Sequence, residues 1–169
     1  MHLVACISGW KDAELLAGCA ASLKGAVDGI VYGDGSYPLF SSDTSFTDAE
    51  SVCSALDEAG APYSIVLPPG DQWASEAEKK SAVLKMSGAS WIVFLDTDER
   101  LEMPAGIAEF RGALEIIDGN LNEWATIGCY MMGGTRGPVR QADLPRFLRM
   151  APDLEFRPPR DFDVYRNGE

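Results

Sequence analysis

The chain has 169 residues, of which 46% are apolar and 24% charged, a balance typical of one globular domain with a single core. Fourteen Lys and Arg residues against 26 Asp and Glu residues give a formal net charge of -12. A charge of this sign excludes the broad positive surface with which proteins bind nucleic acids or anionic membranes. We therefore expect one domain over residues 1–169 that binds no nucleic acid.

The four cysteines, Cys6, Cys19, Cys53 and Cys129, lie far apart and form no Cys-x-x-Cys pair, so the sequence indicates no zinc site. Buried free thiols in a reducing compartment are the simplest explanation for them. No apolar run approaches the ~20 residues of a membrane-spanning helix, and no signal peptide is visible. We expect a cytoplasmic protein with no integral membrane segment.

Strand-like and helix-like segments alternate from the start of the chain, the pattern of a mostly parallel α/β sheet flanked by helices. Apolar runs predict strands at residues 2–7, 29–33 and 63–67, and a fourth at residues 91–96. No linker separates two cores. The expected fold class is therefore a single Rossmann-like α/β domain.

The first two helices are predicted from apolar residues at helical spacing behind capping residues. The first helix has its N-cap at Asp12. Its apolar face comprises Leu15, Leu16, Cys19, Ala20 and Leu23. A capping box of Thr47 with Glu50 predicts the start of the second helix.

The later elements are predicted from similar patterns. A capping box of Ser75 with Glu78 begins a third helix, and Pro104 is the expected first residue of a fourth helix that ends at Gly119. Residues 125–132 read as a fifth strand. After them the chain becomes rich in Gly, Pro and Arg and loses clear periodicity, so we expect an irregular tail that wraps the site.

The apolar run from Trp91 to Leu95 stops at two carboxylates, Asp96 and Asp98. Strand side chains alternate between faces, so both should project to the same side of the strand end. Two like charges at this distance repel, and a divalent cation with oxygen ligands makes the pair favourable. The pattern predicts a Mn²⁺ or Mg²⁺ site. The alternative is the solvated start of a loop, with Glu99 as a first-turn acid of the next helix.

Three polar segments follow predicted strands. They are Ser8-Gly9-Trp10, Asp34-Gly35-Ser36 and Asp96-Thr97-Asp98. In open parallel sheets, ligands bind beyond the carboxyl ends of the strands. One crevice is therefore expected to collect all three segments.

The order of these motifs resembles that of family 2 glycosyltransferases with the GT-A fold, over most of the chain. Asp96-Thr97-Asp98 matches the Asp-x-Asp of that family, and Asp34-Gly35-Ser36 is similar to its Asp-Asp-Gly-Ser turn. Glu78-Lys79-Lys80 is similar to its Glu-Lys-Arg helix. The segment from Pro145 to Arg149 looks like the one that follows the acceptor loop of the family.

The resemblance implies a metal-dependent, hexosyltransferase-like enzyme that moves a sugar from a nucleotide-diphosphate sugar, with UDP-sugar favoured, to an unknown carbohydrate or other hydroxyl acceptor. It implies a nucleotide-sugar-binding half at residues 1–100 and a short acceptor-side half at residues 101–169. Ser8 and Gly35 would line the donor site. Asp34 would hold the base or ribose. Asp96 would lie near the ribose and metal, and Asp98 would ligate the metal.

Basic side chains and a carboxylate base complete the implied site. Lys80, Arg146 or Arg149 would pair with phosphate, and an exposed solubilising charge is the alternative for each. An inverting transferase also needs a carboxylate that removes the acceptor proton, for which Asp143 is the candidate. Asp153 and Glu155 are rivals for that role.

The chain departs from the family pattern after the Arg-rich segment, where the family often supplies a histidine metal ligand. The only histidine here is His2, so Asp161, Asp163 or water would have to be the third ligand. This departure and the short tail support a non-catalytic domain that binds nucleotide or sugar as the alternative function. A phosphatase of the haloacid dehalogenase type also uses Asp-x-Asp, but that class has the motif on its first core strand. A P-loop nucleotidase is excluded because no Gly-x-x-x-x-Gly-Lys-Ser/Thr occurs.

Overall fold

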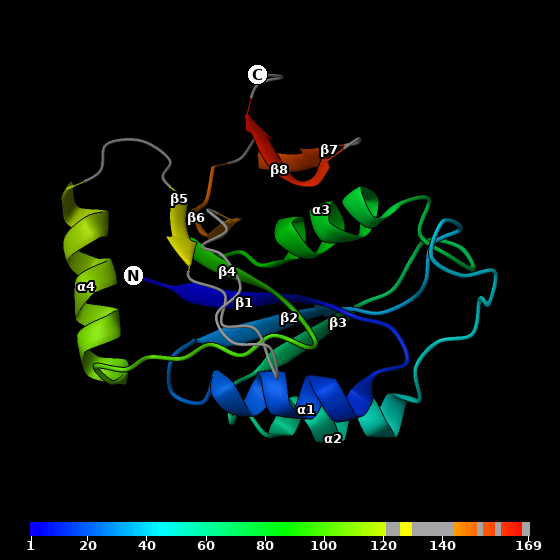
Figure 1. Ribbon diagram of the computed structural model, residues 1–169, viewed down its shortest axis with the longest axis horizontal. Helices are drawn as coiled ribbons and strands as arrows, with labels where there is room; N and C mark the ends of the chain where they lie inside the picture. The colour runs from blue at the N-terminus through cyan, green and yellow to red at the C-terminus, as the bar shows by residue number, and fades with distance from the viewer. Residues whose placement is uncertain (121–125, 130–143, 152–153, 158–159, 167–169) are drawn as a thin grey trace, which may run out of the picture.

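The structure is a computed structural model that describes the chain except residues 121–125, 130–143, 152–153, 158–159 and 167–169 (Figure 1). In chain order the elements are β1 (Leu3–Ser8), α1 (Ala13–Ser22), β2 (Gly29–Gly33), α2 (Ala49–Asp57), β3 (Tyr63–Val66), α3 (Glu76–Met86), β4 (Trp91–Asp96), α4 (Ile107–Asn120), β5 (Thr126–Cys129), β6 (Leu144–Arg149), β7 (Leu154–Arg157) and β8 (Arg160–Arg166). Six strands form one sheet in the order β3-β2-β1-β4-β6-β5. The first four strands of that order are parallel, and β6 is antiparallel to both neighbours. The predicted α/β class is confirmed.

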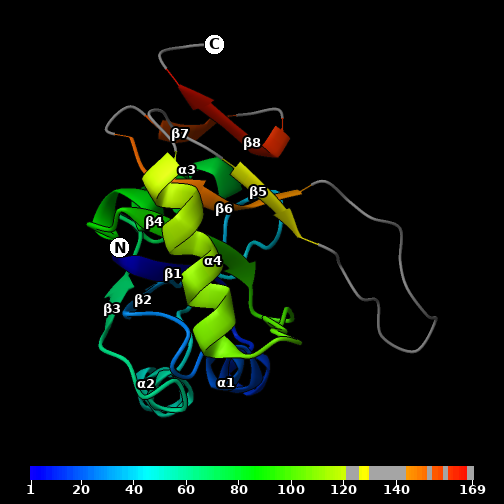
Figure 2. The ribbon, with the colours of Figure 1, turned by 90° about the vertical axis from the view of Figure 1, so that its left-hand side faces the viewer.

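Helices cover both faces of the sheet. In Figures 1 and 2, α1 and α2 lie on one face and α3 on the other, with the β7–β8 hairpin stacked on the far side of α3. Helix α4 packs beside the sheet, where Phe110 meets Phe147 of β6 at 5.5 Å between ring centroids. Burial on both faces explains why the central strands read as nearly continuous apolar runs.

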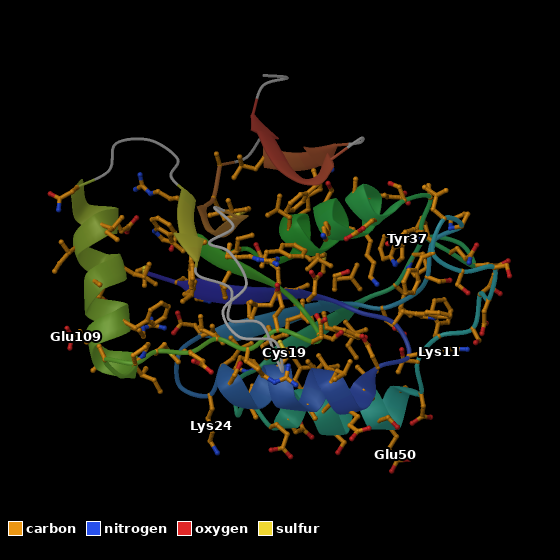
Figure 3. All side chains as sticks on the ribbon, in the orientation of Figure 1. Lys11, Cys19, Lys24, Tyr37, Glu50 and Glu109 are labelled. Carbon is orange, nitrogen blue, oxygen red and sulfur yellow. The ribbon has the colours of Figure 1, made fainter. Side chains whose placement is uncertain are left out.

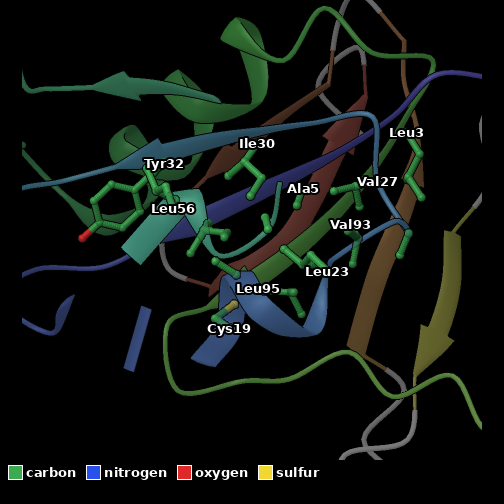
Figure 4. Close-up of a cluster of buried hydrophobic side chains, with 14 of the residues drawn as sticks. Leu3, Ala5, Cys19, Leu23, Val27, Ile30, Tyr32, Leu56, Val93 and Leu95 are labelled. Carbon is green, nitrogen blue, oxygen red and sulfur yellow. The ribbon is translucent and has the colours of Figure 1, made fainter. Parts of the chain in front are cut away.

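The core is divided between these two faces by the alternation of strand residues. Leu3, Ala5 and Ile7 of β1 belong to the cluster under α1 and α2 (Figure 4), whereas Val4 and Cys6 belong to the cluster under α3. Strand β4 alternates in the same way. Both layers are therefore required to cover β1 and β4, the strands that carry the polar segments of the candidate site.

Two helix starts differ from the predictions. Helix α2 is capped by Asp48, whose carboxylate accepts from the Ser51 N–H at 2.9 Å, because Thr47 binds another carboxylate. Helix α4 begins at Ile107 rather than Pro104, because Gly106 has a left-handed backbone with φ of +92°. At α3 the Ser75 hydroxyl does accept from the Glu78 N–H, as predicted, although Glu78 accepts from Ala74.

The expected irregular tail contains β6, which the sequence pattern missed. This strand lies between β4 and β5, and Phe147 faces Val93 across the antiparallel ladder. Arg146 and Phe147 are neighbours on opposite faces of the strand, and both are buried. The sequence of β6 therefore lacks the simple alternation of apolar and polar residues that predicts a strand. The strand matters for the site because it brings Arg146 beside the end of β4.

The cysteines that the structure describes are free thiols, as expected. Cys6 and Cys19 are buried, and burial raises the pKa of the Cys19 thiol to about 12 and that of Cys6 further still. Among the helices within the described residues, none has the length and apolar character needed to cross a bilayer.

Replacing Leu16 by Ala should lower the free energy of unfolding by about 2–5 kcal/mol, because this fully buried side chain would leave a cavity under the sheet. Leu15→Ala is the matched control. The sequence placed Leu15 on the same buried face, but its side chain is 45% exposed, so the control should change stability by less than about 0.5 kcal/mol. Urea denaturation measures both, and equal losses would contradict the assigned helix face.

Candidate functional site

The carboxyl ends of three parallel strands meet at one edge of the sheet. Ser8, the last residue of β1, pairs with Gly33 at the end of β2 on one side and with Asp96 at the end of β4 on the other. The register thus places the loops that follow β1, β2 and β4 next to one another. The predicted meeting of the three polar segments is confirmed.

Lys11 and Tyr37 mark this end of the molecule, and Lys24 and Glu109 lie toward the opposite end (Figure 3).

Two glycines allow the loops after β1 and β2 to approach closely. A Cβ on Gly9 would lie 2.4 Å from the Thr97 methyl and 2.9 Å from the Tyr32 hydroxyl. Gly35 has φ of +105°, and a Cβ there would lie 3.2 Å from the indole nitrogen of Trp73. Neither position accommodates a larger residue without displacement of its neighbours.

The carboxylate of Asp34 connects the loops after β1 and β2 through hydrogen bonds with Thr47. It is 2% exposed and accepts from the Thr47 hydroxyl at 2.6 Å and from the Thr47 N–H at 2.9 Å. The Thr47 hydroxyl in turn accepts from the N–H of Lys11, a residue with φ of +56°. A ribose or base at Asp34 would have to share these oxygens with Thr47, and that predicted contact stays a prediction.

Lys79 lies beneath both loops, and the sequence interpretation gave it no role. Its ammonium is buried and donates to the carbonyl oxygen of Gly9 and, at 2.9 Å, to that of Gly35. The Glu-Lys-Lys motif drew attention only to Lys80. Both lysines are buried, and the sequence does not reveal which of the two reaches the loops at the strand ends.

The Asp-x-Asp segment differs from the expected geometry. Strand β4 ends at Asp96, and residues 97–98 form a turn closed by the bond from the Glu99 N–H to the Asp96 carbonyl, 3.0 Å long. Strand alternation therefore does not extend to Asp98, and the prediction that its side chain projects to the same side as that of Asp96 stays a prediction. Asp98 is exposed, Asp96 is one-third exposed, and Thr97 is buried with its hydroxyl donating to Asp12.

Glu99 is part of this cluster rather than a first-turn acid of the next helix. It accepts from the Asp96 N–H at 2.9 Å and pairs with the guanidinium of Arg146. That guanidinium is also 4.0 Å from the Asp96 carboxylate. Burial raises the pKa of both Asp96 and Glu99, and the nearby positive charges, Lys80 and Arg146 for Asp96 and Arg146 for Glu99, offset part of that rise.

The basic residues predicted to bind phosphate occupy different places. Arg146 and Lys80 are both buried, so the alternative of an exposed charge is wrong for each. Lys80 pairs with Glu76 at 2.6 Å and lies over the Phe94 ring. Arg149 pairs with Asp118 at 3.0 Å and lies opposite Trp91, at the amino end of β4, so it does not belong to this edge.

The candidate base, Asp143, and its rival Asp153 lie outside the described residues. Side-chain positions are also not described for Glu155, Asp161 and Asp163. The roles predicted for these residues stay predictions. Within the part of the chain that is described, no group of three His, Cys, Asp or Glu side chains is arranged to hold a metal ion.

A metal site built on Asp96 and Asp98 fits the chemistry of Mg²⁺ and Mn²⁺ only if the ligand supplies further oxygens. Mg²⁺ usually keeps several waters and binds through one or two carboxylates plus substrate phosphates. The exposed Asp98 and the partly exposed Asp96 meet that minimal requirement. Arg146 already compensates part of the charge at Asp96, so the aspartates alone are a weak cation site.

No protein-family model matches the sequence, and no curated protein sequence matches it either. Solved structures of S. aureus TarS, which have a GT-A-like fold, do match. The structure of TarS 1-349 superposes with a TM-score of 0.58 at 10% identity, over 88% of this chain and 47% of that one. The complex of TarS 1-349 with UDP-GlcNAc gives 0.56 at 11% identity, over 83% and 37%.

The chain thus spans less than half the length of the TarS chains that it matches. At this level of identity the similarity concerns the fold. The GT-A-like architecture that the sequence predicted is confirmed.

Replacing Asp12 by Asn tests the electrostatics of this edge. Burial raises the pKa of Asp12, so the native state binds its proton more tightly than the unfolded state does, and the stability contributed by this group falls as the pH rises through the native pKa. Asn cannot ionise. The free energy of unfolding of Asp12→Asn, relative to wild type, should therefore rise between pH 4 and pH 7.5.

The exposed Glu14→Gln is the control for this comparison, and it should show a smaller change over the same range. Chemical denaturation at the two pH values measures the difference. A relative stability of Asp12→Asn that falls with pH would contradict the cause assigned to the shift.

Proposed function

We propose that this chain is the donor-binding domain of a metal-dependent glycosyltransferase that moves a sugar from a nucleotide-diphosphate sugar to an acceptor hydroxyl. The observation that carries the proposal is the register at Ser8, which aligns the ends of β2 and β4 beside that of β1. The TarS structures with UDP and with UDP-GlcNAc support a UDP-sugar as the first donor to test.

The buried charges support an anionic ligand at this edge. Among the described residues, the charged side chains that are buried are Asp34, Lys79, Lys80 and Arg146. Each lies at or beneath the strand ends. Buried charges cost free energy of folding, so their clustering at one edge of the sheet favours a functional site there.

Asp96 and Asp98 would hold Mg²⁺ or Mn²⁺ together with the diphosphate oxygens. Bound there, the cation would neutralise negative charge that develops on the leaving nucleoside diphosphate. Arg146, buried beside Asp96, would add a fixed positive charge near the leaving diphosphate. The loops connected by Asp34 and Thr47 would form the wall of the nucleoside site.

The cytoplasmic location and the division of the chain into two halves at residue 100 remain predictions from the sequence.

We further propose an inverting reaction, in which a carboxylate accepts the proton of the acceptor hydroxyl as the new glycosidic bond forms. Asp143 remains the candidate for that role on sequence grounds. The non-catalytic binding domain is the competing function, because it would use the same donor site without an acceptor base.

Calorimetric titration should detect UDP binding that strengthens at least about 10-fold when Mn²⁺ or Mg²⁺ is present, because the cation joins the diphosphate to the carboxylates. Asp98→Ala should remove most of that strengthening. Glu115→Ala, which removes an exposed carboxylate on α4, is the control and should bind as wild type does.

Absence of UDP and GDP binding, or binding indifferent to both the cation and Asp98→Ala, would contradict the proposal. Release of UDP from UDP-GlcNAc, with or without an added acceptor, separates the two functions. Tight binding without any release under these conditions would favour the non-catalytic domain.

A further inference from the structure

Lys79 lies beneath the two loops that would form the donor site and can fix their arrangement. Its side chain reaches from α3 to the strand edge, and its ammonium donates to the carbonyl oxygens of Gly9 and Gly35. These two residues belong to different loops, which follow β1 and β2. One buried cation therefore connects the loop after β1 with the loop after β2 through hydrogen bonds.

The packing around Lys79 leaves it little freedom. Its residue is 3% exposed, and the side-chain carbons lie 3.4 Å from where a Cβ on Gly33 would be. The absence of a side chain at Gly33 lets the lysine pass along the end of β2. The ammonium is therefore held in position by its surroundings and does not sample the solvent.

The positive charge of Lys79 also interacts with carboxylates from four segments. Asp12 lies before α1, Asp34 follows β2, Glu76 begins α3 and Asp96 ends β4, and each of these charges favours the protonated lysine. Burial acts in the opposite direction and is the larger effect, so the pKa of Lys79 falls to about 8. The ammonium is thus close to losing its proton at mildly alkaline pH.

We propose that Lys79 is a positioning residue whose ammonium holds the loops after β1 and β2 in the arrangement that binds the donor nucleotide, so that donor affinity depends on its positive charge. The inference rests on the proposed function for the identity of the ligand. Removal of the side chain takes the shared donor from the Gly9 and Gly35 carbonyl oxygens, and loss of its proton removes a positive charge that offsets the nearby carboxylates. An anionic nucleotide would then meet mobile loops and a more negative edge.

A rise in pH through the pKa of Lys79 should change donor affinity and protein stability in opposite directions. The pKa of Lys79 is lower in the native state than in the unfolded state, so the unfolded state binds more protons between about pH 8 and about pH 10.5. The contribution of Lys79 to stability therefore rises with pH over that range. Donor affinity should fall over the same range. A purely structural role of the ammonium would not produce this opposition.

The test measures the Kd of UDP with Mg²⁺ by calorimetry at pH 7.0 and pH 8.5, in wild type, Lys79→Arg, Lys79→Met and the control Lys85→Met. Lys85 is exposed on the same helix. If only the protonated form binds, wild type and Lys85→Met should weaken about fourfold between the two pH values. Lys79→Arg should retain most of the affinity at both values, since Arg keeps its charge.

Lys79→Met should bind at least 10-fold more weakly than wild type at pH 7.0, and its loops 9–12 and 34–47 should exchange amide hydrogen faster while the sheet stays protected. The inference is overturned if folded Lys79→Met binds UDP as wild type does. It is also overturned if wild type and Lys79→Arg show the same pH profile. If wild type binds neither UDP nor GDP, the proposed function itself has failed, which is a different result.

Discussion

The parallel pairing of β1 with both β2 and β4 is the constraint on which the candidate site depends. Because Ser8 lies directly between Gly33 and Asp96, the chain leaves the sheet at three adjacent points on one edge. The loops supply Asp34, Thr47, Asp98 and Glu99, while Lys79 of α3 and Arg146 of β6 reach the same edge from elements that pack beside it. Gly9, where a Cβ would clash with Thr97, and Gly35, whose φ is +105°, let the loops close over the edge, and hydrogen bonds of Lys79 and Thr47 connect these loops.

Charge is distributed unevenly in this acidic protein. The net charge of -12 repels anionic ligands in general, yet the buried cations of the described chain gather at one sheet edge. There they face carboxylates whose pKa values are raised by burial, among them Asp12, Asp96 and Glu99. Burying such a network costs free energy of folding, and under the proposed function it prepares the edge for a charged ligand.

The sequence predicted the parallel core and the strand-end meeting of motifs because these follow from local apolar runs and turn residues, and the resemblance of its motifs to a known family implied the GT-A-like fold. It could not predict contacts between distant segments. Thr47 had the pattern of a helix cap, but it binds Asp34, and Asp48 takes the cap. Lys79 and Lys80 are indistinguishable by pattern. Strand β6 was missed because burial on both faces, with a buried arginine, hides the alternation that marks a strand.

The central claim is that an acidic turn, a buried set of cations and two cross-linked loops form one nucleotide site along a single sheet edge. A crystal of the protein grown with UDP and Mn²⁺ and measured at the manganese absorption edge tests it directly. The expected map has an anomalous peak within coordination distance of the Asp98 carboxylate and the diphosphate, with uridine against the loops after β1 and β2. A nucleotide bound at another face of the sheet, or a manganese peak remote from Asp98, would contradict the claim.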